Sequence, residues 1–147
     1  MLVQSFVQSI SFGATWSGNP DNSDVVSEII NREPALLDVV FECCGDQKAM
    51  DQAVELLKPG GKLMIIGIPS FDNWKFPVDI LRHKELTIQN VRRQVNRVEK
   101  TIKMISEGII NPEPMITHTF PFEDTKMAFD MVSSYSDGVL KAMIDFH

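Results

Sequence analysis

The segment LDVVFECCG, which begins at Leu37, is largely apolar and shows no alternation of apolar and polar positions. Such a segment, rich in β-branched and aromatic residues, is typical of a strand that is buried on both faces of a parallel sheet. A helical stripe follows, made of Met50, Ala53, Val54 and Leu57. The segment Pro59–Gly61 is expected to end this helix, and KLMIIG (62–67) then predicts a second strand with the same buried character.

A further helix–strand unit repeats this order. We predict a helix over Pro77–His83, a strand over LTIQNV (86–91), and another helix that ends at Gly108. The apolar stripe of the last helix consists of Val95, Val98, Ile102 and Ile105. Strands that alternate with helices at this rhythm predict an α/β fold with a parallel sheet and right-handed crossovers.

The start of the chain shows a weaker pattern. Residues 1–14 carry a helical stripe at Val3, Phe6, Val7 and Ile10, and Gly13 stands where a helix-ending glycine is expected. Thr15–Ser17 predicts a short strand, followed by a turn from Gly18. A helix capped by Ser23 or Asp24 is expected to run to about Asn31.

The carboxyl-terminal part has its own pattern, which begins after Asn111. MITHTFP (115–121) predicts a strand, residues 123–135 predict a helix, and VLKAMIDF (139–146) predicts a closing strand. We therefore expect a strand–helix–strand segment at this end of the chain.

Composition excludes several classes of protein. A chain of 147 residues corresponds to about one domain. Its formal charge of −6 argues against nucleic-acid binding, and the basic cluster at Arg92, Arg93 and Arg97 is too short to change this. The apolar runs are far shorter than the roughly 20 residues that span a membrane, and no signal peptide is evident. Two adjacent cysteines without a secretion signal indicate a cytoplasmic protein.

The cysteine pair does not match known thiol or metal motifs. Cys43 and Cys44 are adjacent, whereas a C-x-x-C redox or zinc motif needs two intervening residues. The histidines show no ligand spacing; they are His83, His118 and His147. We therefore interpret the two cysteines as inert thiols at the end of a strand and predict no metal site.

Known phosphate-binding and catalytic motifs are also lacking. No two glycines form G-x-G, and Gly13 and Gly18 have P-loop spacing but are followed by Asn19-Pro20 instead of Lys-Ser/Thr. Nothing pairs Asp38 with Glu42 as acid and base. In an open α/β sheet, ligands bind beyond the carboxyl ends of the strands. The glycines at those ends are equally consistent with a role in turning the chain.

Several ordered segments resemble one protein family. DVVFECCG, LLKPGGKLMIIG, FPVDILRHKELTIQNVRR and EPMITHTFPFEDTKMAFDMV resemble the carboxyl-terminal part of medium-chain zinc-type dehydrogenases, most closely the polyol (sorbitol) dehydrogenases. The resemblance covers roughly residues 11–147. It implies an incomplete Rossmann-like nucleotide-binding domain over residues 1–113 and a segment of the catalytic domain over 114–147. It also implies hydride transfer between a small secondary alcohol or polyol and a nicotinamide cofactor.

The resemblance further implies a set of residues that contact NAD or NADP. Cys44 and Gly45 would lie near the adenosine, and Gly67 and Ile68 along the cofactor. Val91 and Arg93 would lie near the nicotinamide ribose and phosphates, and Lys141 near the pyrophosphate. The family's zinc ligands, proton relay and glycine fingerprint belong to sequence that would precede Met1. We therefore expect no catalytic residue or zinc ligand in this chain, weak or no cofactor binding, and no activity in isolation.

Two other functions remain open from the residues alone. LLKPGGKLMI also suits a methyltransferase-like α/β domain, and the chain could be a non-catalytic module that binds a partner. The resemblance also implies two sheet edges, because in the family's strand order Leu37–Cys43 lies beside a first strand that this sequence lacks, and Leu86–Val91 is an edge strand. Unpaired edges promote association. We predict a homodimer joined through one or both strands, which proline at Val40 or Ile88 should weaken.

Overall fold

The computed structural model describes residues 9–10 and 12–146 of the chain. These residues form two compact units, which we describe separately. The sheet unit comprises Asp24–Val95. The terminal unit comprises the described residues up to Ser23 together with those from Asn96 onward.

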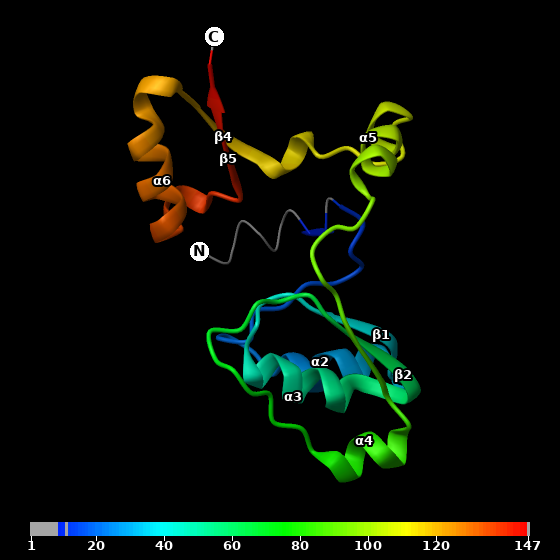
Figure 1. Ribbon diagram of the computed structural model, residues 1–147. Helices are drawn as coiled ribbons and strands as arrows, with labels where there is room; N and C mark the ends of the chain where they lie inside the picture. Colours follow the sequence, from blue (N-terminus) through cyan, green and yellow to red (C-terminus); the bar gives the residue numbers. More distant parts are fainter. Residues whose placement is uncertain (1–8, 11, 147) are drawn as a thin grey trace. The chain divides into compact units, whose positions relative to one another are not determined.

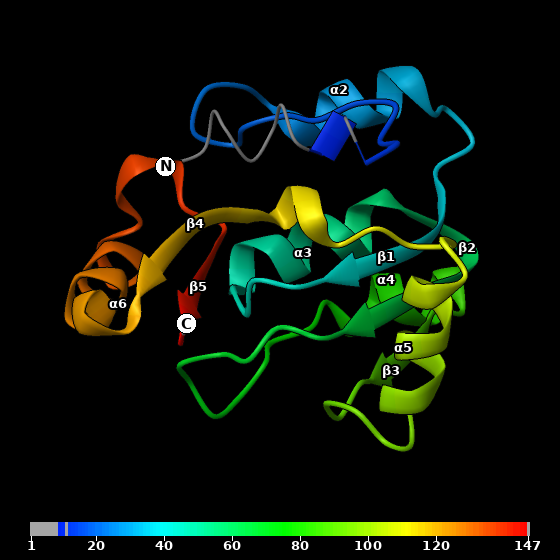
Figure 2. The same ribbon diagram turned by 90° about the horizontal axis from the view of Figure 1, so that it is seen from above.

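The sheet unit is a parallel α/β structure. Its strands are β1 (Leu37–Glu42), β2 (Leu57–Ile65) and β3 (Thr87–Asn90), and they pair in the order β1-β2-β3. Its helices are α2 (Val25–Arg32), α3 (Gln47–Leu56) and α4 (Val78–Lys84), which Figure 1 shows beside the strands. The three strands lie side by side in Figure 2. This arrangement confirms the predicted fold class.

The core of the sheet unit lies on one face of the sheet. Because side chains alternate along a strand, Val40, Leu63 and Ile88 share a face in the observed register. Leu63 is fully buried against α3, whose inward residues are Met50, Ala53 and Val54. Residues of α4 and of the preceding loop also pack against this cluster. The predicted stripe of α3 therefore faces the sheet.

The opposite face of the sheet is open. Val39 is 40% exposed, Phe41 is 61% exposed and Ile66 is 42% exposed. The largely apolar segment predicted burial on both faces of β1, and within the sheet unit this prediction is wrong. The reason is that α3 and α4 both contribute to the core on the face of Val40.

Helix α3 is shorter than the sequence predicted. It begins at its cap Asp46, whose carboxylate accepts hydrogen bonds from the N–H groups of Lys48 and Ala49. It ends at Leu56, and Leu57 is already the first residue of β2. The pairing between β1 and β2 then shifts, because Leu37 pairs with Leu57 whereas Val39 pairs with Lys62. Residues 58–61 therefore form an irregularity in the ladder.

A lysine satisfies the carbonyl groups at the junction of α3 and β2. The Nζ atom of Lys84 donates to the backbone oxygens of Val54 (3.1 Å), Glu55 (2.8 Å) and Leu57 (2.8 Å). The last carbonyls of a helix have no partner within the helix, and a cation near them also interacts favourably with the helix dipole. Lys84 thus ties the end of α4 to the end of α3.

The terminal unit contains the predicted strand–helix–strand segment. Strand β4 (Ile116–Pro121) pairs in parallel with β5 (Lys141–Asp145), and α6 (Thr125–Ser134) connects them. Short 3₁₀ turns lie at Glu113–Met115, Phe122–Asp124 and Ser136–Gly138. The unit also contains α5, which spans Val98–Ser106.

The start of the chain matches its predictions only in part. The predicted positions Val3, Phe6 and Val7 lie outside the described residues. Gly13 has a φ of 95° and donates to the oxygen of Ile10, while Ala14 donates to the oxygen of Ser9, as in a glycine-terminated helix end. Thr15–Ser17 does not form the predicted strand. None of the described strands pairs with this segment.

Candidate functional site

The loops that follow the three parallel strands meet at one edge of the sheet. A pocket of about 350 Å³ lies there, formed by the loops after β2 and β3. Its lining residues are Ile66, Gly67, Ile68, Pro69, Val91, Arg92 and Arg93. We call it the strand-end pocket. It brings together four of the residues that the resemblance implied, namely Gly67, Ile68, Val91 and Arg93.

The other implied residues lie elsewhere. Cys44 and Gly45 follow β1 and do not line the pocket, but they pack closely behind its wall. A Cβ atom on Gly45 would stand 2.5 Å from the carbonyl oxygen of Ile68. Lys141 begins β5 in the terminal unit and borders an apolar hollow beside α6. Its implied contact with a pyrophosphate stays a prediction.

Gly67 is required by the close approach of two loops. The N–H groups of Ile66 and Gly67 both donate to the carbonyl oxygen of Glu42, at 2.8 and 2.9 Å. A Cβ atom on Gly67 would stand 2.2 Å from the nitrogen of Gly45 and 2.9 Å from that of Cys44. Real Cβ atoms do not approach backbone so closely. Here the glycine gives the loops after β1 and β2 room to touch.

Glu42 is a buried carboxylate, which the sequence pattern did not predict. It is only 3% exposed, and its Oε1 accepts hydrogen bonds from the N–H groups of Cys44 (2.8 Å) and Gly45 (2.6 Å) and from the Cys44 thiol (3.0 Å). Burial pushes the pKa of Glu42 upward, but these hydrogen bonds outweigh it and hold the pKa below its usual value. The sequence did contain a signal for this burial, because Glu42 is a charged residue at the end of a largely apolar strand, just before Cys-Cys-Gly.

The strand-end pocket combines an apolar wall with two cations. Ile68 is 79% exposed and Val91 is 39% exposed, so both offer apolar surface to a ligand. Arg92 and Arg93 are exposed, and Arg93 has a φ of 31°, which is unusual for a residue with a side chain. Guanidinium groups bind phosphates through charge-assisted hydrogen bonds. The pocket therefore suits a ligand that joins an apolar ring to phosphate.

The described residues do not form a zinc site. No group of three or more His, Cys, Asp or Glu side chains lies together in the part of the chain that the structure describes. Cys43 and Cys44 are exposed free thiols.

The two thiols should react slowly at neutral pH. Burial, followed by the charge of Glu42, raises the pKa of Cys43; burial, followed by the hydrogen bond to Glu42, raises that of Cys44. Because the thiolate is the nucleophile, raising the pKa lowers its fraction at a given pH. We expect alkylation by iodoacetamide to be slow at pH 7 and to accelerate above about pH 9. Mass spectrometry of the native and denatured chains can measure this, and equal rates at pH 7 would contradict it.

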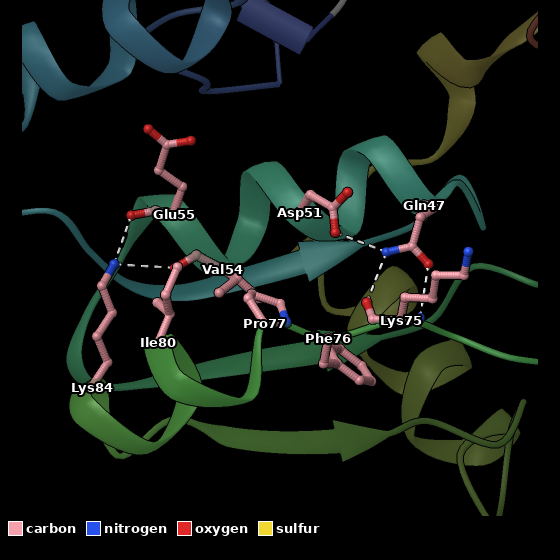
Figure 3. A pocket seen from close by; sticks show the side chains of 9 residues that line it. All are labelled: Gln47, Asp51, Val54, Glu55, Lys75, Phe76, Pro77, Ile80 and Lys84. Atoms are coloured by element: carbon pink, nitrogen blue, oxygen red, sulfur yellow. Dashed lines mark hydrogen bonds between the residues drawn. The ribbon is translucent and has the colours of Figure 1, made fainter.

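A larger cavity of about 650 Å³ lies on the helical side of the sheet unit (Figure 3). The amide of Gln47 lies at its edge: Oε1 accepts from the N–H of Lys75 (3.0 Å), and Nε2 donates to the Lys75 oxygen (2.9 Å) and to Asp51 (2.8 Å). Lys84, at the other end, is bound to backbone oxygens. The polar groups at both ends therefore hold the fold together, and we assign no site here.

None of the described helices is long and apolar enough to cross a membrane.

A family model and several known proteins match this chain. A family model described as zinc-binding dehydrogenase matches residues 6–107. A zinc-type alcohol dehydrogenase-like protein of Escherichia coli (strain K12), itself uncharacterized, is 34% identical over 98% of this chain and 41% of its own length. The sorbitol dehydrogenase of Bacillus subtilis (strain 168) is 28% identical over 90% of this chain and 38% of its own.

A solved structure shows the same fold. A short chain alcohol dehydrogenase from Escherichia coli CFT073, complexed with its cofactor NADH, superposes with a TM-score of 0.87 at 22% identity. The alignment covers 97% of this chain and 42% of that one. This chain thus spans about two fifths of the length of the proteins that it matches.

Proposed function

Because the chain belongs to the zinc-binding dehydrogenase family, we propose that its sheet unit supplies one side of the cofactor site of an NAD(P)-dependent zinc-type alcohol or polyol dehydrogenase. The observation that carries the proposal is the strand-end pocket, where apolar side chains and two guanidinium groups meet beyond the carboxyl ends of parallel strands. When bound, the nicotinamide cofactor supplies the hydride chemistry.

The proposal gives the residues of the pocket separate tasks. Ile68 and Val91 provide apolar surface for a ring, and Gly67 keeps the backbone behind them close and fixed. Arg93, with Arg92 beside it, binds phosphate oxygens. Cys44, Gly45 and Lys141 are the further contacts that the family resemblance implies. They would lie towards the adenosine and the pyrophosphate.

The substrate class and compartment are also part of the proposal. A small alcohol or polyol is supported by the sorbitol dehydrogenase among the relatives, and both NAD and NADP are retained as cofactors. The negative charge continues to argue against nucleic acid as a partner. The free cysteines favour the cytoplasm. A methyltransferase-like function is not favoured, because the family match and the reported relatives are dehydrogenases.

A hybrid enzyme tests the proposed function. The matching part of the Bacillus subtilis sorbitol dehydrogenase would be replaced by this chain, and we expect the hybrid to turn over a polyol with NAD or NADP. Arg93→Ala should raise the KM for the cofactor by about 10-fold, because a charge-assisted hydrogen bond contributes about 1.5–3 kcal/mol. The exposed Lys100 on α5 provides the matched control, Lys100→Ala. A folded hybrid without turnover, or an unchanged KM in Arg93→Ala, would contradict the proposal.

We further propose that the chain forms a homodimer through an edge of its sheet. Successive N–H groups alternate in direction along a strand. Val91 donates to the oxygen of Ile65 on β2, so the N–H of Ile88 points away from β2. The carbonyl of Glu42 faces β2, so the N–H of Val40 points into the sheet. Proline at Ile88 therefore tests an interface formed through β3, because it removes an outward N–H group. Proline at Val40 would instead remove an N–H group that points into the sheet.

We expect light scattering to give the mass of a dimer, and Ile88→Pro to convert it to a monomer by removing an outward donor. Circular dichroism and the melting temperature would establish that the variant keeps its fold. A monomeric wild-type chain at high concentration would refute the dimer. A folded Ile88→Pro dimer would exclude β3 as the joint.

A further inference from the structure

The carboxylate of Glu42 lies directly behind the wall of the strand-end pocket. Its Oε2 atom is buried and has no hydrogen-bond partner among the described residues. A Cβ atom on Gly67 would stand 2.6 Å from this oxygen, and Gly67 lines the pocket. The carboxylate is therefore separated from a bound ligand by one glycine of the pocket wall.

The charge of Glu42 should act strongly at this position. Hydrogen bonds from the loop after β1 keep the pKa of its carboxyl below the usual range, against the opposing effect of burial, so the group is ionised at neutral pH. Buried charges are screened by solvent and salt much less than exposed ones. The cations at the pocket, Arg92 and Arg93, are both exposed and hence screened more strongly.

We propose that the buried carboxylate of Glu42 biases the strand-end pocket towards a cationic aromatic ring, and so shifts cofactor affinity towards the oxidised nicotinamide. The oxidised ring carries a positive charge, whereas the reduced ring is neutral and the rest of the cofactor is the same. A negative charge behind the wall distinguishes these two rings by their charge. Glu42 is thus a specificity-determining residue that need not touch the ligand. This inference rests on the proposed function, because it requires the nicotinamide to lie in this pocket.

The test compares NAD⁺ with NADH on the full chain, using amide resonances of Gly67 and Val91 to measure both dissociation constants. Glu42→Gln keeps the size of the side chain and one acceptor oxygen but removes the charge. We expect it to shift the affinity ratio about 3- to 10-fold towards NADH, as for a single charge acting across a partly screened protein wall. Asp38→Asn is the matched control. It removes the same charge at the start of β1, roughly 13 Å away along the strand, and should leave the ratio unchanged.

A second measurement does not depend on the cofactor or on the folding of the variant. Cys44 lies at the same edge and contacts Glu42, so methanethiosulfonates bearing a trimethylammonium or a sulfonate group report the local potential. We expect the cationic reagent to be favoured several-fold in the native chain relative to the denatured chain. An unchanged preference would overturn the inference.

The outcomes separate this inference from the proposed function. If NADH shifts the strand-end resonances but Glu42→Gln leaves the NAD⁺ to NADH ratio unchanged, the role of Glu42 is refuted and the cofactor site stands. If neither nucleotide shifts those resonances at about 10 mM, in the isolated chain or in the hybrid enzyme, both are refuted. The inference would also be overturned if Asp38→Asn changed the ratio of the NAD⁺ and NADH affinities as much as Glu42→Gln does. The change would then reflect the net charge of the chain alone.

Discussion

Gly67→Ala is expected to destabilise the sheet unit by about 3 kcal/mol and to abolish ligand binding at the strand-end pocket. The added methyl group would stand 2.2 Å from the nitrogen of Gly45 and 2.6 Å from Oε2 of Glu42. Neither neighbour is the free end of a flexible side chain, since one is backbone and the other is a buried carboxylate. The loops after β1 and β2 must therefore separate, which breaks the hydrogen bonds that join them.

Gly60→Ala provides the matched control for this substitution. Gly60 has a φ of 75°, but a Cβ atom there would meet nothing within 4 Å. Its alanine variant carries only the cost of a left-handed backbone, about 1 kcal/mol. Urea unfolding of both variants measures the difference. If the two variants have the same free energy of unfolding, the loops after β1 and β2 can separate at no cost in stability. That result would contradict this prediction.

Lys84→Met should destabilise the chain by about 2–3 kcal/mol, because it removes charge-assisted hydrogen bonds to three backbone oxygens. Methionine keeps most of the apolar stem, so the loss reflects the ammonium group. The carbonyls of Val54 and Leu57 would lose this donor at the point where α3 passes directly into β2. The effect is therefore expected at the junction, with early amide exchange at the start of β2.

Lys48→Met is the control for the loss of a lysine charge. Lys48 is exposed in the first turn of α3, where a cation contributes little or is unfavourable. We expect its unfolding free energy to lie within about 0.5 kcal/mol of the wild type. Equal destabilisation by both substitutions would indicate a general charge effect instead of a specific cap.

The sequence contained enough information to predict the parallel sheet. The largely apolar segments that begin at Leu37 and Lys62, separated by a stripe of helical period, correspond to β1, α3 and β2. The local pattern did not predict the end of α3, which depends on contacts with residues distant in the sequence. Helix α3 ends at Leu56 because the chain enters the β1–β2 ladder at Leu57, and Lys84, far along the sequence, supports that junction.

The position of the candidate site could be predicted from the sequence, but the contacts within it could not. The carboxyl ends of the strands, with Gly67 and Arg93, follow from the order of strands and from the family resemblance. The role of Glu42 could not be predicted, because its burial depends on two loops that touch only in the folded chain. The same holds for the open face of Val39 and Phe41, since the covering of a sheet is a property of the assembled helices.

A titration of the isolated chain with NADH, followed by amide resonances, tests the cofactor site most directly. We expect weak binding, with a dissociation constant in the millimolar range, because no glycine fingerprint is present in the sequence. The amides of Gly67, Ile68, Val91 and Arg93 should shift together, whereas that of Gly60, in the irregularity between β1 and β2, should not. Shifts confined to other parts of the chain would contradict the assignment of the strand-end pocket as a cofactor site, and a dissociation constant in the micromolar range would contradict the expected weak binding.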